Sequence, residues 1–536
     1  MRLTFVTVCL ILLLPSFNVF QSVNEPRILS SIDFARESQL SHVRVVSVYQ
    51  RVTDGIFLIN RSIGDVIDLL KETRTDFIFR GWWRFHPCPE NATDSSGFFT
   101  PDELEEAVEA GYTYEYLKDA VAEIKEELPN VIFCGAIGAQ FLHAKRDRNP
   151  ITGEIFYKND TWRMALDPSK WGISVTKEEF LQEWSKDHEG YGVNGPFYFP
   201  DITNPDFQEL LLSWAKKQID CGVDAIWIDL LYTQAGLFYN YAKDHPEEQE
   251  NAIIACKDSY RAATAIIDAI RHYGTLKGRK IYVGTWLYPA VDIHRALPEL
   301  ELPKLDFVTV SIPSKEVLSM EFSDERWKRI VEDAHSNFGN ILIISLLDWA
   351  SGIYTGLGTF SQKLTPDEQR RFLRKADLFM CKKGIVFAYP IHGGNMGKEA
   401  TRLSFGEFKV YDSLAPEFKT YETIVRLAQN KSEGSPLVVI ERPRDYLYIF
   451  DREIIHLGIP LIVGKITITV DAYDGEGIDR VEFYVNNNLK STDYDEPYSW
   501  LWSEFAIGRY KIRVIAYDNL GKKGGDEIGI IVFNWG

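Results

Sequence analysis

Short apolar segments alternate with longer amphipathic segments from about residue 42 to about residue 428. The apolar segments are rich in β-branched residues, which is typical of parallel strands that are buried on both faces. We predict strands at Val43–Tyr49, Asp76–Gly81, Val131–Ile137, Asp224–Leu230, Lys280–Trp286, Phe307–Ser311, Ile341–Leu347 and Gly384–Tyr389. Eight strands with helices between them are the number that closes a (β/α)8 TIM barrel, so this α/β fold is predicted.

Helix start signals lie between these strands. Thr100-Pro-Asp-Glu and Thr365-Pro-Asp-Glu each combine an N-cap hydroxyl, a proline at the first helical position and a capping-box Glu. Thr176-Lys-Glu-Glu repeats the box. The loops after the second and third strands, residues 83–111 and 141–203, are long, whereas the turns that lead into strands are short. Because barrel active sites are built from the loops that follow strands, these long loops mark the predicted functional face.

The C-terminal part of the chain has a different pattern. Apolar and polar residues alternate with period two in Val481-Glu-Phe-Tyr-Val and in Tyr510-Lys-Ile-Arg-Val-Ile-Ala-Tyr, which predicts an all-β sandwich. Residues 431–445 contain Ser, Gly and two prolines and are predicted to be a linker. We therefore divide the chain into a barrel at 23–430, a linker at 431–445 and a sandwich at 446–536.

The sandwich has a recognisable signature. Val481-Glu-Phe-Tyr-Val is followed by Pro497-Tyr-Ser-Trp, Trp502 and Ile515-Ala-Tyr-Asp. This pattern resembles the immunoglobulin-like modules attached to many exported microbial enzymes and surface proteins. The resemblance implies an immunoglobulin-like fold, and it leaves three roles open: binding a cell-surface glycan, spacing the enzyme from the cell, or stabilising it.

The N-terminus indicates export. One positive residue precedes an apolar run from Leu3 to Leu14, which is short for a bilayer span and typical of a signal peptide. We predict a signal peptide at residues 1–22, with an uncleaved anchor as the alternative and no other membrane span. Glycosylation sequons, which fit an exported glycoprotein, occur at Asn60, Asn91, Asn159 and Asn430. The predicted location is therefore secreted or cell surface.

Composition excludes several classes of function. The formal net charge is −18 and no Lys/Arg-rich run occurs, so a nucleic-acid partner is not expected. The chain contains no C-x-x-C pair, no His-x-His on the first strand, no phosphate-binding glycine loop and no Gly-x-Ser-x-Gly, so neither a catalytic metal nor a cofactor is predicted. Aromatic residues make up 13%, which suits either sugar stacking or a large aromatic core.

The fourth predicted strand carries the sharpest catalytic signal. Gly222-Val-Asp-Ala-Ile-Trp-Ile-Asp229 is an apolar strand with an acid at its C-terminal end, which points into the mouth of a barrel. This stretch resembles the barrel glycoside hydrolases of the α-galactosidase and α-glucosidase kind, in which a fourth-strand Asp in a Trp-x-Asp context is the nucleophile. The resemblance implies that Asp229 is the nucleophile or its counterpart.

Glycoside hydrolysis needs a second carboxyl group. The best partner is Asp348, which ends the seventh strand and lies across the barrel mouth from the fourth. Glu316, after the sixth strand, is the reserve candidate. Many retaining barrel glycosidases place their carboxylates on strands four and seven, normally as Glu, whereas this chain has Asp at both positions and lacks the usual Asn-Glu on the fourth strand.

Other residues at strand ends are predicted to bind substrate. They are Tyr49, Arg80, Trp82, Arg84, Gln140, His143, Asp201, Tyr232, Trp286, Tyr288, His392 and Asn395. A charge on a buried strand costs several kcal/mol unless it is paired, so Arg80 is expected to pair with a carboxylate. The sequence predicts a secreted glycoside hydrolase that acts on a poly- or oligosaccharide. A non-catalytic glycan-binding or surface protein on a barrel scaffold is the alternative.

Overall fold

The computed structural model describes residues 40–54, 59–349 and 355–536, and the predicted signal peptide lies outside them. Eight parallel strands form a closed barrel, with β12 pairing to β1 in the register Val46↔Ala388. All eight predicted strands are confirmed. They are β1 (Val46–Tyr49), β2 (Phe77–Arg84), β3 (Ile132–Gly138), β8 (Ala225–Asp229), β9 (Tyr282–Trp286), β10 (Phe307–Ser311), β11 (Leu342–Leu346) and β12 (Val386–Asn395).

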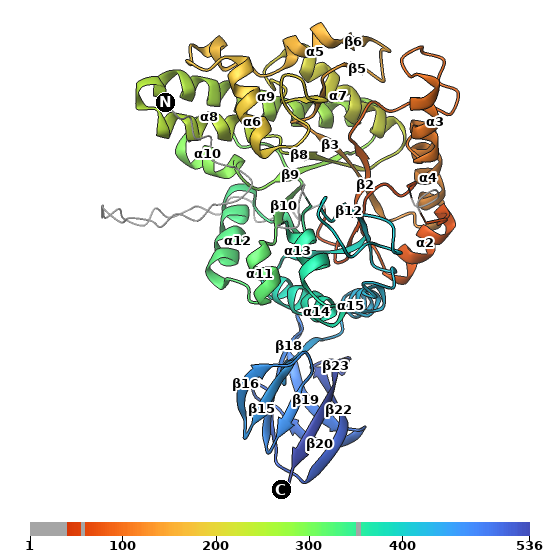
Figure 1. Ribbon diagram of the computed structural model, residues 1–536, viewed down its shortest axis with the longest axis vertical. Coiled ribbons are helices and arrows are strands. Elements are labelled where there is room, and N and C mark those ends of the chain that lie inside the picture. The colour runs from red at the N-terminus through yellow and green to blue at the C-terminus, as the bar shows by residue number, and fades with distance from the viewer. Residues whose placement is uncertain (1–39, 55–58, 350–354) are drawn as a thin grey trace.

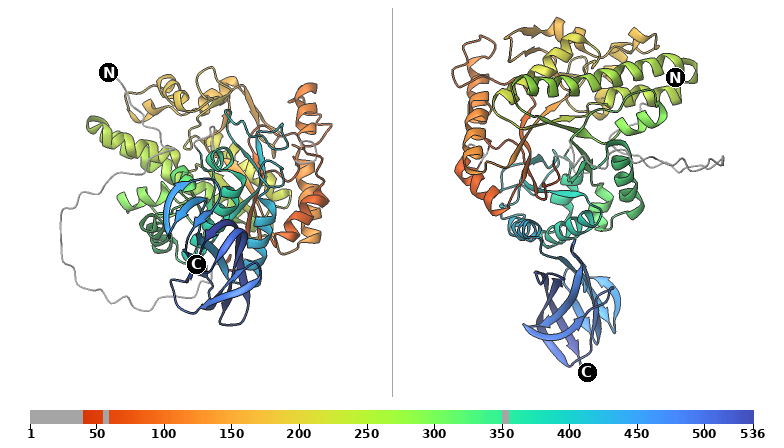
Figure 2. Two further views of the ribbon diagram at one scale, coloured as in Figure 1. Left: turned by 60° about the horizontal axis from the view of Figure 1, so that its bottom comes forward. Right: turned by 180° about the vertical axis from the view of Figure 1, so that it is seen from behind.

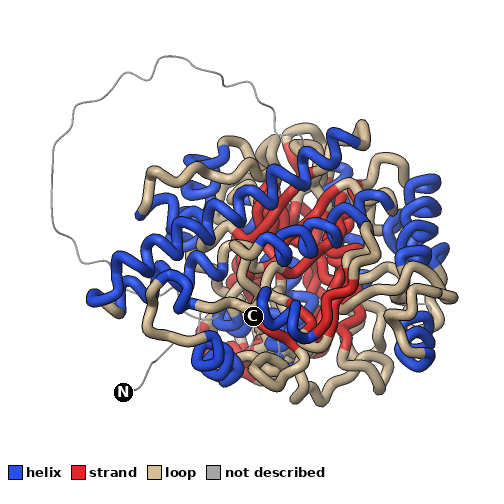
Figure 3. Tube along the Cα trace, turned by 90° about the horizontal axis from the view of Figure 1, so that it is seen from above, coloured by secondary structure: helices blue, strands red, loops and turns tan. Residues whose placement is uncertain are grey.

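Helices surround this barrel, as the view from above shows (Figure 3). The α-helices are α2 (Ile63–Glu72), α3 (Pro101–Glu109), α4 (Tyr114–Glu127), α5 (Lys158–Met164), α6 (Lys177–Asp187), α7 (Pro205–Asp220), α8 (Thr233–Asp244), α9 (Gln249–Leu276), α10 (Ala290–Ala296), α11 (Ser314–Ser319), α12 (Asp324–Phe338), α13 (Gly356–Lys363), α14 (Pro366–Lys382) and α15 (Tyr421–Glu433). The described residues also contain two 3-10 helices, η1 (Pro168–Trp171) and η2 (Pro246–Glu248). Among the described residues, no helix is both long and apolar enough to cross a bilayer.

The predicted helix starts are confirmed. Thr100, Thr176 and Thr365 each accept a hydrogen bond from the backbone N–H three residues on, and the Glu at that position reaches back to the cap. Each such cap stabilises its helix by about 1 kcal/mol. The long loop between β3 and α7 contains the short pairs β4 (Leu142–His143) with β7 (Phe197–Tyr198) and β5 (Arg146–Arg148) with β6 (Ile155–Tyr157). An antiparallel strand, β13 (Val410–Asp412), extends the barrel sheet beside β12.

The C-terminal region is a β-sandwich that lies beyond α14 and α15 (Figures 1 and 2). One sheet contains β14 (Leu437–Arg442), β18 (Ile466–Tyr473) and β21 (Ser499–Trp502). The other has the order β16 (Arg452–His456), β15 (Tyr446–Ile449), β17 (Leu461–Val463), β23 (Lys523–Asn534), β22 (Ala506–Asp518), β19 (Ile478–Val485) and β20 (Asn488–Asp493). The chain thus combines a closed α/β barrel with an all-β module.

Residues 431–445 differ from the predicted linker. Gly434, with φ 63°, ends α15 in the left-handed conformation that favours glycine, and β14 follows almost at once. The side chains of β14 alternate between two cores: Leu437 and Val439 pack into the barrel cluster, whereas Val438 and Ile440 pack into the sandwich cluster. The Ser, Gly and Pro residues therefore mark a helix end and turns around a shared strand.

Candidate active site

Two carboxylates lie at the mouth of the barrel, and both come from strand ends. Asp229 is the last residue of β8, and Asp348 follows β11. The indole N–H of Trp286, at the end of β9, donates a 2.6 Å hydrogen bond to Asp229. Asp229 is 9% exposed, while the side chain of Asp348 is 29% exposed. The structure thus brings together the predicted acids Asp229 and Asp348 with the predicted substrate residue Trp286.

Arg80 supplies the positive charge between these acids. Its guanidinium lies 3.5 Å from Asp348 and is stacked between the rings of Trp227, at 4.2 Å, and Trp349, at 3.9 Å. The side chain is only 2% exposed. The sequence-based expectation that Arg80 pairs with a carboxylate is therefore confirmed.

A bulge in β2 turns Arg80 inward. Ile78 pairs with Phe133 and Trp82 with Gly135, so three residues of β2 lie opposite Cys134 alone. Arg80 has φ 57°, a left-handed conformation that costs a non-glycine residue roughly 1–2 kcal/mol. Leu230, directly after Asp229, is also left-handed, with φ 53°. Backbone strain of this kind collects at functional sites, where the surroundings hold a side chain in a required position.

Burial dominates the electrostatics of the two acids. Burial raises the pKa of Asp229 to about 6, and the charge of Asp348 adds to the rise, although Arg80 and the Trp286 N–H oppose it. Burial also raises the pKa of Asp348, which the adjacent Arg80 counteracts. A carboxyl group with a pKa near 6 carries a proton for part of the time in a neutral solution, which suits a general acid.

Aromatic side chains that the sequence analysis missed surround Arg80 beneath the two acids. Trp83, Trp227 and Trp349 belong to the cluster inside the barrel, together with Trp286. The position of Trp227 could have been found from the sequence, because it lies two residues before Asp229 and therefore shares its face of β8. Trp83 could have been found in the same way, because alternation along β2 places it on the inner face with Phe77 and Phe79.

Glu316, the reserve acid, has different partners. It accepts hydrogen bonds from the indole N–H of Trp327 at 2.8 Å and from the backbone N–H of Ser323 at 3.2 Å, and it lies 3.8 Å from Arg326. In the contacts of the described residues, none joins it to Asp229 or Asp348. Glu316 therefore anchors the start of α12 to α11.

Trp82 and Arg84 face the helices, contrary to the prediction. Trp82 is fully buried and stacks on Tyr112 with ring centroids 5.2 Å apart. Arg84 pairs with the buried Asp147 at 2.6 Å and lies 3.6 Å from the ring of Trp214. Alternation along β2 places both side chains outside the barrel, and the bulge rotates Arg80 alone to the inner side.

Tyr49 and His392 also lie outside the barrel interior, in a buried charge cluster. His392 contacts Asp412 at 2.7 Å and Asp54 at 2.9 Å, and Arg61 bonds to both Asp412 and the hydroxyl of Tyr49. Burial alone would lower the pKa of His392, but Asp54 and Asp412 raise it to about 9. This imidazolium is therefore charged at neutral pH, and it ties β12 to β13 and to the segment after β1.

Three further predicted residues bond to helices or loops. Asp201 accepts a hydrogen bond from Gln234 at 3.0 Å and also pairs with Lys170. The hydroxyl of Tyr232 shares a 3.0 Å hydrogen bond with Thr264 on α9. The hydroxyl of Tyr288 donates to Asp333 on α12 at 2.7 Å. These residues lie several positions after the end of a strand, where the in-and-out alternation of strand side chains no longer predicts which way a side chain points.

The remaining predicted residues are Gln140, His143 and Asn395, the last of which ends β12. The backbone oxygen of Gln140 accepts a 3.3 Å hydrogen bond from Tyr191, and the exposed Asn395 caps the N–H of Gly397 at 2.8 Å. His143, on β4, joins a group of aromatic rings.

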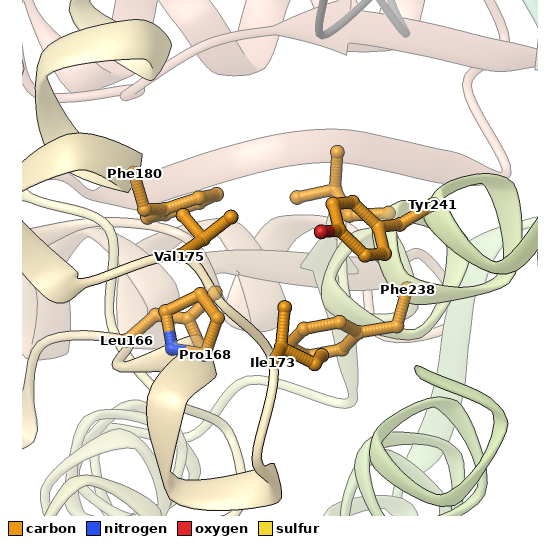
Figure 4. A pocket seen from close by; sticks show the side chains of 8 residues that line it. Leu166, Pro168, Ile173, Val175, Phe180, Phe238 and Tyr241 are labelled. Carbon is orange, nitrogen blue, oxygen red and sulfur yellow. The ribbon is translucent and has the colours of Figure 1, made fainter. Parts of the chain in front are cut away.

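A small pocket outside the mouth is lined only by apolar side chains and Tyr241. Figure 4 shows residues of the η1 and α6 region, including Leu166, Ile173 and Phe180, facing Phe238 and Tyr241 of α8. The pocket offers no group for catalysis. Within the described part of the chain, no cluster of His, Cys, Asp or Glu is arranged to hold a metal ion, and the five cysteines there are free.

Comparison with known proteins identifies the C-terminal module. Residues 461–514 match a bacterial Ig domain. No curated protein matches the chain. A fibronectin(III)-like structure of Clostridium thermocellum CbhA is 26% identical over 19% of this chain and 47% of its own, with a TM-score of 0.15.

Among the solved structures that match a larger share of this chain are glycoside hydrolases. A β-glucuronidase of Bacteroides uniformis is 11% identical over 92% of this chain, with a TM-score of 0.40. An endo-β-1,4-mannanase of Cellulomonas fimi is 13% identical over 93% of this chain and 97% of its own, with a TM-score of 0.33. The chain spans 46% of the glucuronidase, less than half of that protein's length. At these values the likeness assigns no activity.

Proposed function

We propose that the barrel is a glycoside hydrolase and that Asp229 and Asp348 are its two catalytic carboxyl groups. The observation that carries this proposal is the acid pair itself: the buried carboxyl group of Asp229 and the partly exposed one of Asp348, at the ends of two strands of one barrel mouth, with Arg80 beside them. Glycosidic bond cleavage needs one carboxyl group to protonate the leaving oxygen and a second to attack the sugar or activate water. The partly exposed rings of Trp286 and Trp349 provide apolar surface on which a pyranose ring can stack.

The surroundings of the two acids favour distinct roles. Asp229 is the more buried, and its raised pKa suits the proton donor. Asp348 is the more exposed and pairs with the guanidinium of Arg80, which favours its ionised form and suits the nucleophile or base. This assignment reverses the one implied by the α-galactosidase and α-glucosidase resemblance, and it is our preferred mechanism.

A cleavage screen tests the function. The protein is incubated with a panel of polysaccharides, and new reducing ends are measured for the wild type and for the double variant Asp229→Asn, Asp348→Asn. We expect release from at least one polysaccharide by the wild type alone. Equal release by both proteins would remove these acids from the mechanism. Binding without release would favour a glycan-binding protein.

We also propose that the protein acts outside the cytoplasm. The apolar run from Leu3 to Leu14 and the bacterial Ig domain at residues 461–514 support this location. Expression in a host with an export pathway, followed by N-terminal sequencing of the protein from the medium, tests it. We expect a new N-terminus near Ser22, and retention of intact Met1 in the cytoplasm would contradict the proposal.

A further inference from the structure

A group of five rings projects from the loops that follow β2 and β3. They belong to Phe85, His86, Phe141, His143 and Phe197, and we call them the aromatic platform. Phe197 is its hub, with ring centroids 5.9 Å from Phe85, 5.7 Å from His86, 5.9 Å from Phe141 and 5.4 Å from His143. The antiparallel pair of β4 with β7 places His143 directly opposite Phe197 and so fixes the centre of the platform.

The platform begins beside Asp229. Gly138 ends β3 and pairs with Asp229, whose backbone oxygen accepts a 3.0 Å hydrogen bond from Ala139. The ring of Phe141 covers Gly138 so closely that a Cβ there would lie 2.5 Å from it. Phe141 also packs against the inner cluster that holds Trp286. The aromatic surface therefore continues from the acid pair out to Phe85.

The rings of the platform remain accessible to a ligand. Phe85 is 37% exposed, and His86, Phe141, His143 and Phe197 are half-buried. Within the described residues, the imidazole of His86 forms no hydrogen bond, so its nitrogen atoms can bond to a ligand.

The two imidazoles add no charge to the platform. Burial lowers the pKa of His86 to about 4, and burial also lowers the pKa of His143. Both imidazoles are thus neutral at physiological pH and offer one donor and one acceptor each. Flat apolar rings with neutral polar edges complement the face and the hydroxyl groups of an uncharged pyranose.

We propose that the aromatic platform is a binding subsite for an uncharged sugar unit of an oligosaccharide whose scissile bond lies between Asp229 and Asp348. The proposal rests on the proposed glycoside hydrolase function, and it adds that the substrate is a neutral chain that extends beyond the acid pair.

Binding measured without catalysis tests the subsite. Asp229→Asn protein is titrated by calorimetry with neutral disaccharides and hexasaccharides of the β-1,4-glucose, β-1,4-mannose, β-1,4-xylose and α-1,4-glucose series, and with a galacturonate hexasaccharide as the charged comparison. Phe197→Leu keeps an apolar side chain but removes the ring at the hub. Tyr157→Leu, at a ring that is 61% exposed on β6, is the matched control in the same loop.

We expect one neutral hexasaccharide series to bind more tightly than its disaccharide and than the galacturonate. Phe197→Leu should weaken the hexasaccharide about tenfold and the disaccharide less than about twofold, whereas Tyr157→Leu should change neither. Phe85→Ala, which removes an exposed ring, should also weaken hexasaccharide binding without affecting folding.

The alternative outcomes separate this inference from the proposed function. Unchanged hexasaccharide affinity in both Phe197→Leu and Phe85→Ala, or no binding of any neutral hexasaccharide, would overturn the subsite even if the wild type cleaves a short glycoside. Loss of binding in both variants together with a wild type that cleaves nothing would support the subsite and overturn the enzyme.

Discussion

Replacing Asp229 with asparagine should stabilise the protein at neutral pH while it lowers activity on a polysaccharide. Burial raises the pKa of Asp229 from its ordinary value of 3.8 to about 6, so ionising this group in the folded protein costs roughly 3 kcal/mol more than in the unfolded chain. The folded state therefore binds the proton more tightly than the unfolded state. The contribution of Asp229 to the free energy of unfolding of the wild type therefore falls as the pH rises from about 4 to about 6, and it stays low above that range.

Asparagine resembles the protonated acid and does not titrate. The free energy of unfolding of Asp229→Asn minus that of the wild type should thus grow by about 1–3 kcal/mol between about pH 4 and about pH 8. Urea unfolding followed by tryptophan fluorescence at both pH values measures the difference.

Asp412 provides a control, because its replacement by asparagine should lower the stability of the protein at neutral pH instead of raising it. Although burial alone would raise the pKa of Asp412, hydrogen bonds from His392 and Arg61 lower it. Asp412 contributes its full stabilisation at pH values above its pKa in the unfolded chain. This stabilisation is lost as the pH falls through the lower pKa that Asp412 has in the folded protein. Asp412→Asn should therefore destabilise the protein most at about pH 8.

A gain in the free energy of unfolding of Asp229→Asn that stays constant or shrinks from acid to neutral pH would refute the claim that Asp229 is buried at an energetic cost.

Further predictions follow from the site and from the shared strand. The value of kcat/KM should fall above about pH 6 as Asp229 loses its proton. In Arg80→Gln, the acidic limb of the pH profile should move upward by about one pH unit, because Asp348 loses the cation that favours its ionised form. A profile without a basic limb, or an acidic limb that does not move, would contradict these roles. With an aryl glycoside whose leaving group needs no proton, Asp229→Asn should lose far less activity than Asp348→Asn, and the reverse order in a kinetic assay would exchange the two roles. In calorimetry, Val439→Ala should lower the free energy of unfolding of the barrel, and Val438→Ala that of the sandwich, each by about 2 kcal/mol. The reason is that adjacent side chains of β14 enter different cores. The same effect of both variants on both unfolding transitions would contradict this division.

The barrel could be predicted from the sequence because its strands are buried on both faces. Such strands are continuous apolar runs, as in Ala-Ile-Trp-Ile-Asp229 of β8, and their pattern depends only on local residues. Capping boxes such as the one at Thr100 are equally local. The two strand-end acids of the mouth followed from the same reasoning, because the C-terminal ends of parallel strands meet at one face.

Side-chain direction could not be predicted where it depends on distant contacts. The bulge that turns Arg80 inward is visible only in the pairing of β2 with β3. Glu316 follows a strand like a catalytic acid, but its partner Trp327 lies on the next helix. His392 was expected at the mouth, yet its position depends on Asp54 and Asp412, which are far from each other in the sequence.

The central claim is that Asp229 and Asp348 perform the chemistry, and the turnover rates of isosteric variants test it most directly. On the best polysaccharide from the cleavage screen, kcat is measured for Asp229→Asn, Asp348→Asn and Glu316→Gln, each checked for folding. We predict a loss of about 10³-fold for each of the two mouth variants and a rate near that of the wild type for Glu316→Gln. Wild-type turnover by either mouth variant, or a comparable loss in Glu316→Gln, would contradict the account.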